Sequence, residues 1–354
     1  MGSADGGGCA ELEEEVGGGN PVPRQHRLGL LGGEGAGAER RNDGGLRDRD
    51  GRRPAGDSGD MGQPPREWGG QCAALPETRP GDTTVPMNPI DDLFRRLRAE
   101  NRKAFVPFLT AGDPDLPFTA DALPAVAAAG ASLVEVGVPF SDPIADGPVI
   151  QASYTRALGR GLKLADVFAT LKQVTASPGW RTPLSAMASY SLVFRRGPDA
   201  FIQAAQAAGL SGAVVPDLPV EEADDLAKRC RDRDFKLTLL VTPTTSPERA
   251  EKVVRACGGF VYVVSVVGIT GERDRLPVDL RGMMARLRTM TDLPLCVGFG
   301  VSRPEQVAEL KEIADGVIVG SALVRKLEAA GGDRARALAD VRAAVAQLSG
   351  ALNG

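Results

Sequence analysis

Short apolar runs alternate with helix-like stretches along most of this 354-residue chain. Eight such runs lie at 104–112, 132–140, 183–189, 212–217, 236–243, 260–268, 295–300 and 315–322. The stretches between them often begin with Ser, Asp or Pro and end at Gly, as capped helices do. Near-continuous apolar strands are typical of a parallel sheet buried on both faces. The pattern therefore predicts an α/β fold, a (β/α)8 TIM barrel, preceded by a helix that begins at Asn88-Pro89 and runs to about Glu100.

An open, doubly wound sheet is the alternative arrangement of the same elements. That fold usually carries a GxGxxG turn after its first strand. Here the first run ends in the sequence TAGDP at 110–114, which offers no such turn. The barrel is therefore the fold that we expect.

Residues 1–86 differ in composition from the rest of the chain. They hold 21 of the 44 glycines and 8 of the 26 prolines, and they lack lysine, isoleucine, phenylalanine and tyrosine. Such a segment buries too little apolar area to offset its loss of chain entropy, so we expect a disordered extension. It has neither the apolar region of a secretory signal nor the acid-poor composition of a transit peptide. We expect residues 87–354 to form the catalytic domain, with Met87 as the native start and 1–86 as a misassigned or non-functional extension.

The composition argues against several classes of function. A net charge of −4 is unlike that of a basic nucleic-acid-binding protein. The apolar runs are shorter than the ~18 residues that a membrane-spanning helix needs. Five cysteines without paired spacing favour a reducing cytoplasm over a disulfide scaffold. The sole histidine, His26, lies in the N-terminal extension, which argues against histidine-based triads and zinc sites.

The second apolar run carries a carboxylate near its C-terminal end, where TIM-barrel enzymes place catalytic groups. Side chains alternate along a strand, so Val134 and Val136 should face the helices and Glu135 the barrel interior. A buried carboxylate is costly, so Glu135 is either satisfied structurally or functional. The long loop at 139–148 adds Asp142 and Asp146, each of which either caps a turn or acts in a site.

The last three apolar runs end in turns that contain glycine. Gly271 follows the sixth run, Gly300 ends the seventh, and Gly320-Ser321 follows the eighth and opens a short helix. Backbone N–H groups beside glycine approach an anion closely, and a helix N-terminus adds a favourable dipole. The loops after strands 7 and 8 are also the usual phosphate site of this fold. We therefore expect a phosphate-bearing ligand.

Six motifs resemble those of the tryptophan synthase alpha subunit family. They are FVPFLTAGDPD (105–115), LVEVGVPFSDPIADGPVIQ (133–151), VPDLPVEE (215–222), YVVSVVGITGER (262–273), VGFGVSRPEQV (297–307) and DGVIVGSALV (315–324). The resemblance covers about 87–354, and the long motif through the second loop is the most specific. Residues 1–86 lie outside the family pattern.

The resemblance implies a carbon–carbon lyase of tryptophan biosynthesis. Its reaction is the retro-aldol cleavage of indole-3-glycerol phosphate to indole and glyceraldehyde 3-phosphate. Glu135 matches the family's catalytic acid and base, and Asp146 matches the carboxylate that stabilises positive charge at the indole nitrogen. The family's substrate-binding positions correspond to Gly271, Gly300, Gly320 and Ser321 for phosphate, to Phe108, Tyr262 and Phe299 for indole, and to Thr270 on a loop that closes over substrate. Phe108 and Phe299 have plain core packing as their alternative role.

The same resemblance implies a cytoplasmic α2β2 heterotetramer. Its beta subunit carries pyridoxal phosphate, and the alpha chain itself needs no cofactor or metal. Asp142 and the 217–222 segment, which begins with Asp217, would lie near that partner. The sequence departs from the family at the end of the third run, where Ser189 precedes Ser191 and Ser191 replaces an expected Asn.

Three other functions stay open at this point. The first is a stand-alone indole-3-glycerol-phosphate lyase. The second is another phosphate-sugar barrel, such as an isomerase or epimerase, and the third is a non-catalytic activating partner of the beta subunit.

Overall fold

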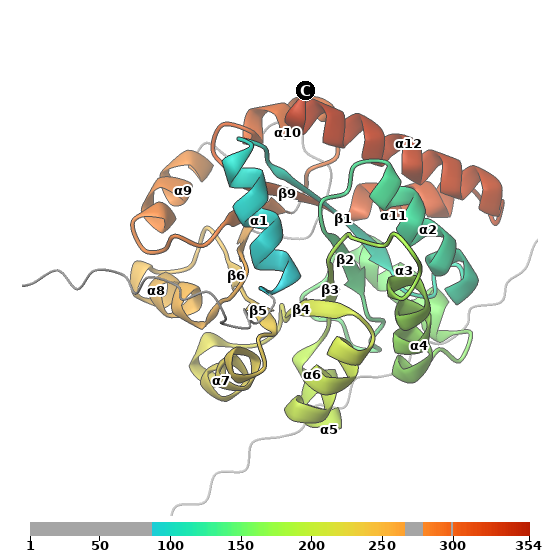
Figure 1. Ribbon diagram of the computed structural model, residues 1–354, viewed down its shortest axis with the longest axis horizontal. Coiled ribbons are helices and arrows are strands. Elements are labelled where there is room, and N and C mark those ends of the chain that lie inside the picture. The colour runs from blue at the N-terminus through green and yellow to red at the C-terminus, as the bar shows by residue number, and fades with distance from the viewer. Residues whose placement is uncertain (1–86, 266–278, 299) are drawn as a thin grey trace, which may run out of the picture. The chain divides into compact units, whose positions relative to one another are not determined.

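The computed structural model describes residues 87–265, 279–298 and 300–354. In this part of the chain a parallel β-sheet rolls into a barrel that helices surround (Figure 1), so the TIM-barrel prediction is confirmed. The strands are β1 (Ala104–Thr110), β2 (Val134–Gly137), β3 (Leu184–Met187), β4 (Leu210–Val214), β5 (Lys236–Thr238), β6 (Leu240–Val241), β7 (Val261–Val264), β8 (Leu295–Gly298) and β9 (Gly316–Val319). The predicted extension at 1–86 lies outside the described residues.

The helices follow the strands in the expected alternation, with two α-helices rather than one after each of β2, β3 and β9. They are α1 (Pro89–Ala99), α2 (Leu116–Ala128), α3 (Pro148–Leu158), α4 (Leu164–Thr175), α5 (Tyr190–Arg196), α6 (Pro198–Ala207), the 3₁₀-helix η1 (Val220–Glu222), α7 (Asp224–Asp232), α8 (Pro247–Ala256), α9 (Leu280–Arg288), α10 (Pro304–Leu310), α11 (Ser321–Ala329) and α12 (Arg334–Asn353). Within the described ranges, no helix combines the length and apolarity needed to cross a membrane.

The fifth apolar run forms two short strands rather than one. β5 pairs with β4 and β6 pairs with β7, so the strand order β5-β4-β3-β2-β1-β9-β8-β7-β6 begins and ends in one stretch of chain. Leu239 lies between the two strands, and its N–H donates to Sγ of Cys257 at 3.2 Å. Its carbonyl accepts from the N–H of Tyr262 at 3.3 Å. The chain itself therefore closes the barrel at Leu239.

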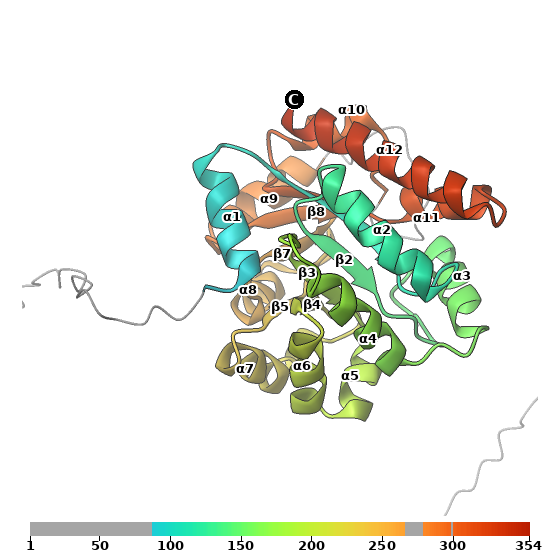
Figure 2. The ribbon, with the colours of Figure 1, turned by 45° about the vertical axis from the view of Figure 1, so that its right-hand side comes forward.

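Strand side chains alternate between two apolar cores. Val134 and Val136 belong to the outer core between the sheet and the helices, whereas Leu133 belongs to the core inside the barrel. The inner core also receives the apolar face of α1, namely Ile90, Leu93, Phe94 and Leu97. In both ribbon views α1 lies across one end of the barrel (Figures 1 and 2). The N-terminal end of the barrel is thus closed by α1.

Asn88 fixes the position of α1 at that end. Its side-chain oxygen accepts from the N–H of Ile90 at 2.9 Å, which caps the helix. Its amide group donates to the carbonyl of Ser211 at 3.0 Å and to that of Asp234 at 2.7 Å. The helix predicted from Asn88-Pro89 is therefore present, and the same asparagine ties it to the chain around β4 and β5.

Candidate active site

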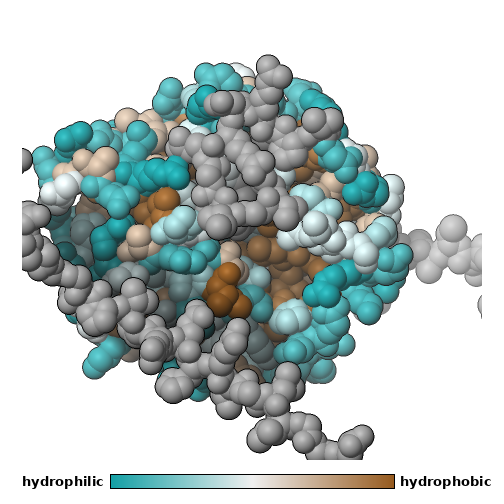
Figure 3. All heavy atoms as spheres, turned by 180° about the vertical axis from the view of Figure 1, so that it is seen from behind, coloured by the Kyte–Doolittle hydropathy of each residue, from teal (hydrophilic) through white to brown (hydrophobic). Residues whose placement is uncertain are grey.

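A cavity of about 760 Å³ lies at the C-terminal ends of the strands. Viewed from the side opposite α1, the surface is hollowed, and apolar atoms on the floor of the hollow are bordered by hydrophilic residues (Figure 3). Its walls come from the strand ends, the loop after β2, the turn after β8 and the start of α11. This is the face where TIM-barrel enzymes carry their active sites.

Glu135 lies inside the barrel and lines this cavity, as the alternation along β2 predicts. Its register partners on the neighbouring strands are Phe108 of β1 and Ser185 of β3. The residue is 1% exposed, and its Oε2 has no hydrogen-bond partner in the described part of the chain. Burial, and then the charge of Asp146, raise the pKa of Glu135 to about 8. The carboxyl group is therefore protonated at neutral pH.

Asp146 lines the same cavity from the loop after β2. The side-chain amide of Gln151 in α3 donates to the backbone carbonyl of Asp146 at 2.7 Å and to that of Pro143 at 3.3 Å, which holds the loop over the barrel mouth. Burial, and then the charge of Asp217, raise the pKa of Asp146 to about 7. Two carboxyl groups that ionise near neutral pH thus face one cavity, an arrangement suited to acid–base chemistry.

Asp217 adjoins Asp146 across a smaller cavity of about 260 Å³. One carboxylate oxygen accepts from Ser189 Oγ at 2.6 Å, and the other accepts from the N–H of Tyr190 at 2.7 Å. Asp217 therefore binds the N-terminal end of α5, and its negative charge acts on Asp146. Ser189, at the unusual end of the third run, supplies one of these hydrogen bonds.

The opposite end of the cavity has the features of an anion site. Gly300 adopts a positive φ of 75° after β8, and Gly320 is the N-cap of α11, whose first residue is Ser321. The N–H groups of this helix start have no partner within the helix and favour negative charge. Oγ of Ser302 is buried there without a hydrogen-bond partner among the described residues. Arg325 is the only cationic side chain among the cavity-lining residues that the structure describes.

The sequence reasoning missed Ser302 and Arg325. The signal for Arg325 was present, because a residue four positions after Ser321 lies on the same face of a helix. Ser302 carried no signal of its own. Thr270, Gly271 and Phe299 lie outside the described residues.

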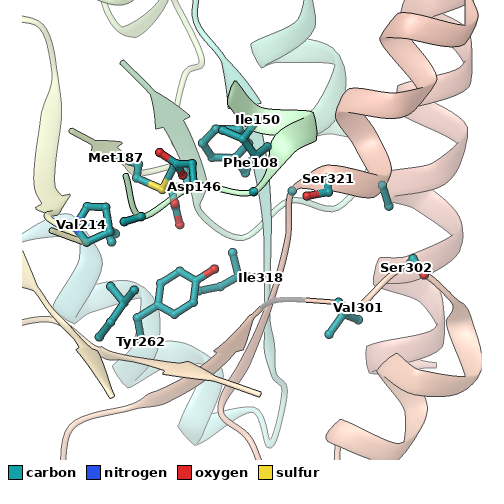
Figure 4. A pocket seen from close by; sticks show the side chains of 18 of the residues that line it. Phe108, Asp146, Ile150, Met187, Val214, Tyr262, Val301, Ser302, Ile318 and Ser321 are labelled. Atoms are coloured by element: carbon teal, nitrogen blue, oxygen red, sulfur yellow. The ribbon is translucent and has the colours of Figure 1, made fainter. Parts of the chain in front are cut away.

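Apolar side chains occupy the space between the carboxylates and the anion site. Figure 4 shows Asp146, Met187 and the ring of Tyr262 on one side of the cavity, and Ser302 and Ser321 on the other. Further apolar lining residues are Phe108, Ile150, Val214, Leu240, Val301 and Ile318. Of these, sequence reasoning named Phe108 only. The middle of the cavity is therefore lined mainly by apolar side chains.

Two glycines make room for the aromatic rings of this part of the cavity. A Cβ on Gly137 at the end of β2 would lie 2.3 Å from Cζ of Phe108. A Cβ on Gly298 at the end of β8 would lie 2.3 Å from the hydroxyl oxygen of Tyr262. Such contacts are far inside van der Waals distance, so both rings depend on glycine at the adjoining strand end.

Two of the residues expected near a partner differ in their surroundings. Asp142 is exposed in the loop after β2, beside Ile144, whose side chain is 76% exposed. Asp217 is half-buried and engaged with α5. The interface role of both residues stays a prediction. Across the described ranges, no group of three or more His, Cys, Asp or Glu side chains is placed to hold a metal ion.

The family model described as "Tryptophan synthase alpha chain" matches residues 94–353. This chain belongs to the tryptophan synthase alpha chain family. The tryptophan synthase alpha chain of Rhodopirellula baltica is 51% identical over 242 residues, which cover 68% of this chain and 87% of that protein. The alpha chain of Rippkaea orientalis is 49% identical over 242 residues, covering 68% and 90% of the two chains.

Solved structures of tryptophan synthase alpha chains share the fold. The crystal structure of the alpha subunit from Legionella pneumophila has a TM-score of 0.68 at 33% identity, covering 75% of this chain and 99% of that chain. A structure of Mycobacterium tuberculosis tryptophan synthase has a TM-score of 0.69 at 33% identity, covering 76% and 100%. The family resemblance seen in the sequence is confirmed. The tryptophan synthase alpha chain is a lyase of tryptophan biosynthesis that cleaves indole-3-glycerol phosphate.

Proposed function

We propose that this chain cleaves indole-3-glycerol phosphate to indole and glyceraldehyde 3-phosphate with Glu135 and Asp146 as its catalytic residues. One observation carries the proposal. A single cavity holds a buried, protonated carboxyl group at one end and the N-terminus of α11 at the other, with an apolar slot between them. A flat aromatic ring joined to a phosphate through a short polar chain matches these three zones.

The first step is protonation of the indole ring. Glu135, which is protonated at neutral pH, donates its proton to C3 of indole. The ring nitrogen then carries a positive charge, which the Asp146 carboxylate stabilises in a site of low dielectric. The raised pKa of Glu135 therefore serves the reaction, because an ordinary glutamate would have lost its proton at this pH.

The second step breaks the carbon–carbon bond. The Glu135 carboxylate accepts the proton from the glycerol hydroxyl beside the ring, and that carbon becomes the aldehyde. The electron pair of the broken bond returns to the ring and neutralises the nitrogen, so Asp146 loses its positive partner. Glu135 ends the cycle protonated, as it began, and no redox cofactor is needed.

The phosphate would bind at the turn after β8 and the start of α11. Backbone N–H groups near Gly300, Gly320 and Ser321 approach it, and Arg325 supplies a side-chain positive charge from one turn further along α11. By family resemblance, Gly271 completes this site, Thr270 lies on the closing loop, and Phe299 contacts indole.

Substitution of Arg325 by Ala tests the anion end of the cavity. A charge-assisted hydrogen bond contributes ~1.5–3 kcal/mol, so KM for indole-3-glycerol phosphate should rise by roughly 10- to 100-fold with a smaller change in kcat. Steady-state kinetics measure both constants. Lys326→Ala removes an exposed cation from the next position of α11 and is the matched control. An unchanged KM in the Arg325 variant would remove this side chain from the phosphate site.

We infer that the physiological form is an α2β2 complex in the cytoplasm, as family membership supports. Pyridoxal phosphate belongs to the beta subunit in this proposal. Asp142, on the exposed loop after β2, would lie on the side that faces the partner. So would Asp217, which follows β4 and accepts a hydrogen bond from the start of α5. Residues 87–354 would be the functional domain with Met87 as its start, since the family model begins at residue 94.

Indole release from indole-3-glycerol phosphate tests the proposed function directly. The full chain and the chain from Met87 are assayed with and without a beta subunit from a related organism. We expect slow release that rises at least tenfold with the beta subunit, at similar rates for both lengths. Fast release without the beta subunit would indicate a stand-alone lyase. Absence of release under both conditions would contradict the proposal.

A further inference from the structure

Two buried polar groups on neighbouring strands lack hydrogen-bond partners. Oε2 of Glu135 in β2 and Oγ of Ser185 in β3 are both unpartnered among the described residues. Each residue is 1% exposed. A buried polar group without a partner is destabilising, so two such groups on adjacent strands call for a common explanation.

The sheet register places these two side chains next to each other. Glu135 and Ser185 are partners in the parallel pairing of β2 with β3. Register partners in a parallel sheet point to the same face, and Glu135 points into the barrel. On the far side of Ser185 the register continues to Gly212 of β4, which has no side chain to compete for its hydroxyl. Rotation of the serine about its Cα–Cβ bond, between ordinary staggered positions, redirects Oγ relative to Glu135.

A hydroxyl group suits a neighbour that must gain and lose a proton. It donates a hydrogen bond to a carboxylate, and it accepts one from a protonated carboxyl group. An amide or ammonium donor would favour only the ionised form. A serine beside an acid–base residue therefore supports both states of the catalytic cycle.

We propose that Ser185 is a positioning residue that hydrogen-bonds the Glu135 carboxyl group, directly or through one enclosed water, in both of its protonation states. This inference rests on the proposed function, in which Glu135 alternates between acid and base. It assigns to β3 a role that no family motif in the sequence indicated. Ser185 does not touch the substrate in this scheme and acts only through Glu135.

Other titratable groups also face Glu135 and are unchanged by a substitution at Ser185. They are Asp146 from the loop after β2, Tyr154 from α3, Tyr262 from β7 and Cys296 from β8. A hydrogen bond to a carboxylate is stronger than one from a neutral acid. Removal of the serine hydroxyl should therefore raise the pKa of Glu135 further.

The experiment compares Ser185→Ala with Ser185→Thr in the full chain with its beta subunit. For Ser185→Ala we expect kcat to fall roughly tenfold with KM within about twofold, and the alkaline limb of the pH–rate profile to move upward by about half a unit or more. Ser185→Thr retains the hydroxyl and should restore most of kcat and the original limb. Titration of ¹³C-labelled glutamate by NMR, with Glu135→Gln to assign the signal, measures the same shift without turnover.

Ser153→Ala is the matched control. Ser153 is another fully buried serine, but its hydroxyl already bonds Thr110 at 2.6 Å and the carbonyl of Ile150 at 2.7 Å. It should lower stability without moving the pH limb. If Ser185→Ala leaves both the limb and the NMR titration in place while Glu135→Gln abolishes cleavage, the positioning role is wrong and the proposed function stands. If Glu135→Gln retains cleavage, the proposed function itself fails.

Discussion

Replacement of Glu135 by Gln should lower kcat for the cleavage of indole-3-glycerol phosphate by roughly 10²- to 10⁴-fold, the contribution typical of a positioned general acid and base. Gln has nearly the shape of Glu but can neither give nor take a proton in the required steps. The anion end of the cavity lies on other strands, so affinity for glycerol 3-phosphate, a probe of that end alone, should stay within about threefold. Single-turnover kinetics and calorimetric titration measure the two quantities.

The same substitution should stabilise the fold at alkaline pH. The pKa of Glu135 is raised from an ordinary 4.5 to about 8 by burial, so between these values the folded state holds a proton that the unfolded state has lost. The free energy of unfolding therefore falls as pH rises through this window, by up to ~5 kcal/mol, and stays low above it. The neutral Gln side chain removes this dependence, so the variant should exceed the wild type at pH 9 and match it more closely at pH 4.5.

Denaturant unfolding of both proteins at the two pH values checks this expectation. Lys326→Ala, an exposed change remote from the carboxyl groups, should leave the pH dependence of stability as it is in the wild type. Loss of activity without the gain in alkaline stability would mean that Glu135 is not held as a buried acid. Full activity of Glu135→Gln would contradict its catalytic role altogether.

A plot of kcat/KM for cleavage against pH should be bell-shaped and narrow. Glu135 must be protonated to start the reaction, which requires a pH below about 8. Asp146 must be ionised to stabilise the indole cation, which requires a pH above about 7. The two groups interact, so the limbs of kcat/KM report the pair rather than either residue alone. We expect a maximum between the two values and a fall of about tenfold per pH unit on either side.

Asp146→Asn assigns the acid limb of this bell. Loss of the carboxylate should lower kcat/KM by roughly 10²- to 10³-fold, as for removal of a group that stabilises charge in the transition state. The residual activity should no longer fall on the acid side, whereas the alkaline limb, which belongs to Glu135, should persist. A profile that keeps its acid limb would show that another group sets it.

The sequence predicted the barrel and the two carboxyl groups for physical reasons that act locally. Alternation of side chains along β2 is a property of any strand, so Glu135 could be placed inside from its neighbours Val134 and Val136 alone. The split of the fifth run could not be predicted in this way. Leu239 is apolar like its neighbours, and its separation of β5 from β6 depends on Cys257 and Tyr262, which lie far along the chain.

The surroundings of the two carboxyl groups also depend on tertiary structure. Ser185 is a small polar residue in an apolar run, and nothing in its own strand shows that Glu135 lies beside it. Only the register between β2 and β3 makes the pair visible. Asp217 likewise looks like a surface residue of a loop until its bonds to Ser189 and Tyr190 place it near Asp146.

Leu239, where the barrel closes, separates the chain into two halves, and each half supplies a different part of the site. The proposed catalytic residues Glu135 and Asp146 precede this point, and Gly320 and Arg325 of the proposed anion site follow it. The sheet joins the halves at two places, the pairing of β1 with β9 and the chain at Leu239 itself. The distance between the two halves thus sets the length of a substrate that spans both. Packing changes at either junction would alter that distance, and with it the substrate length that fits, without changing any residue that contacts the ligand.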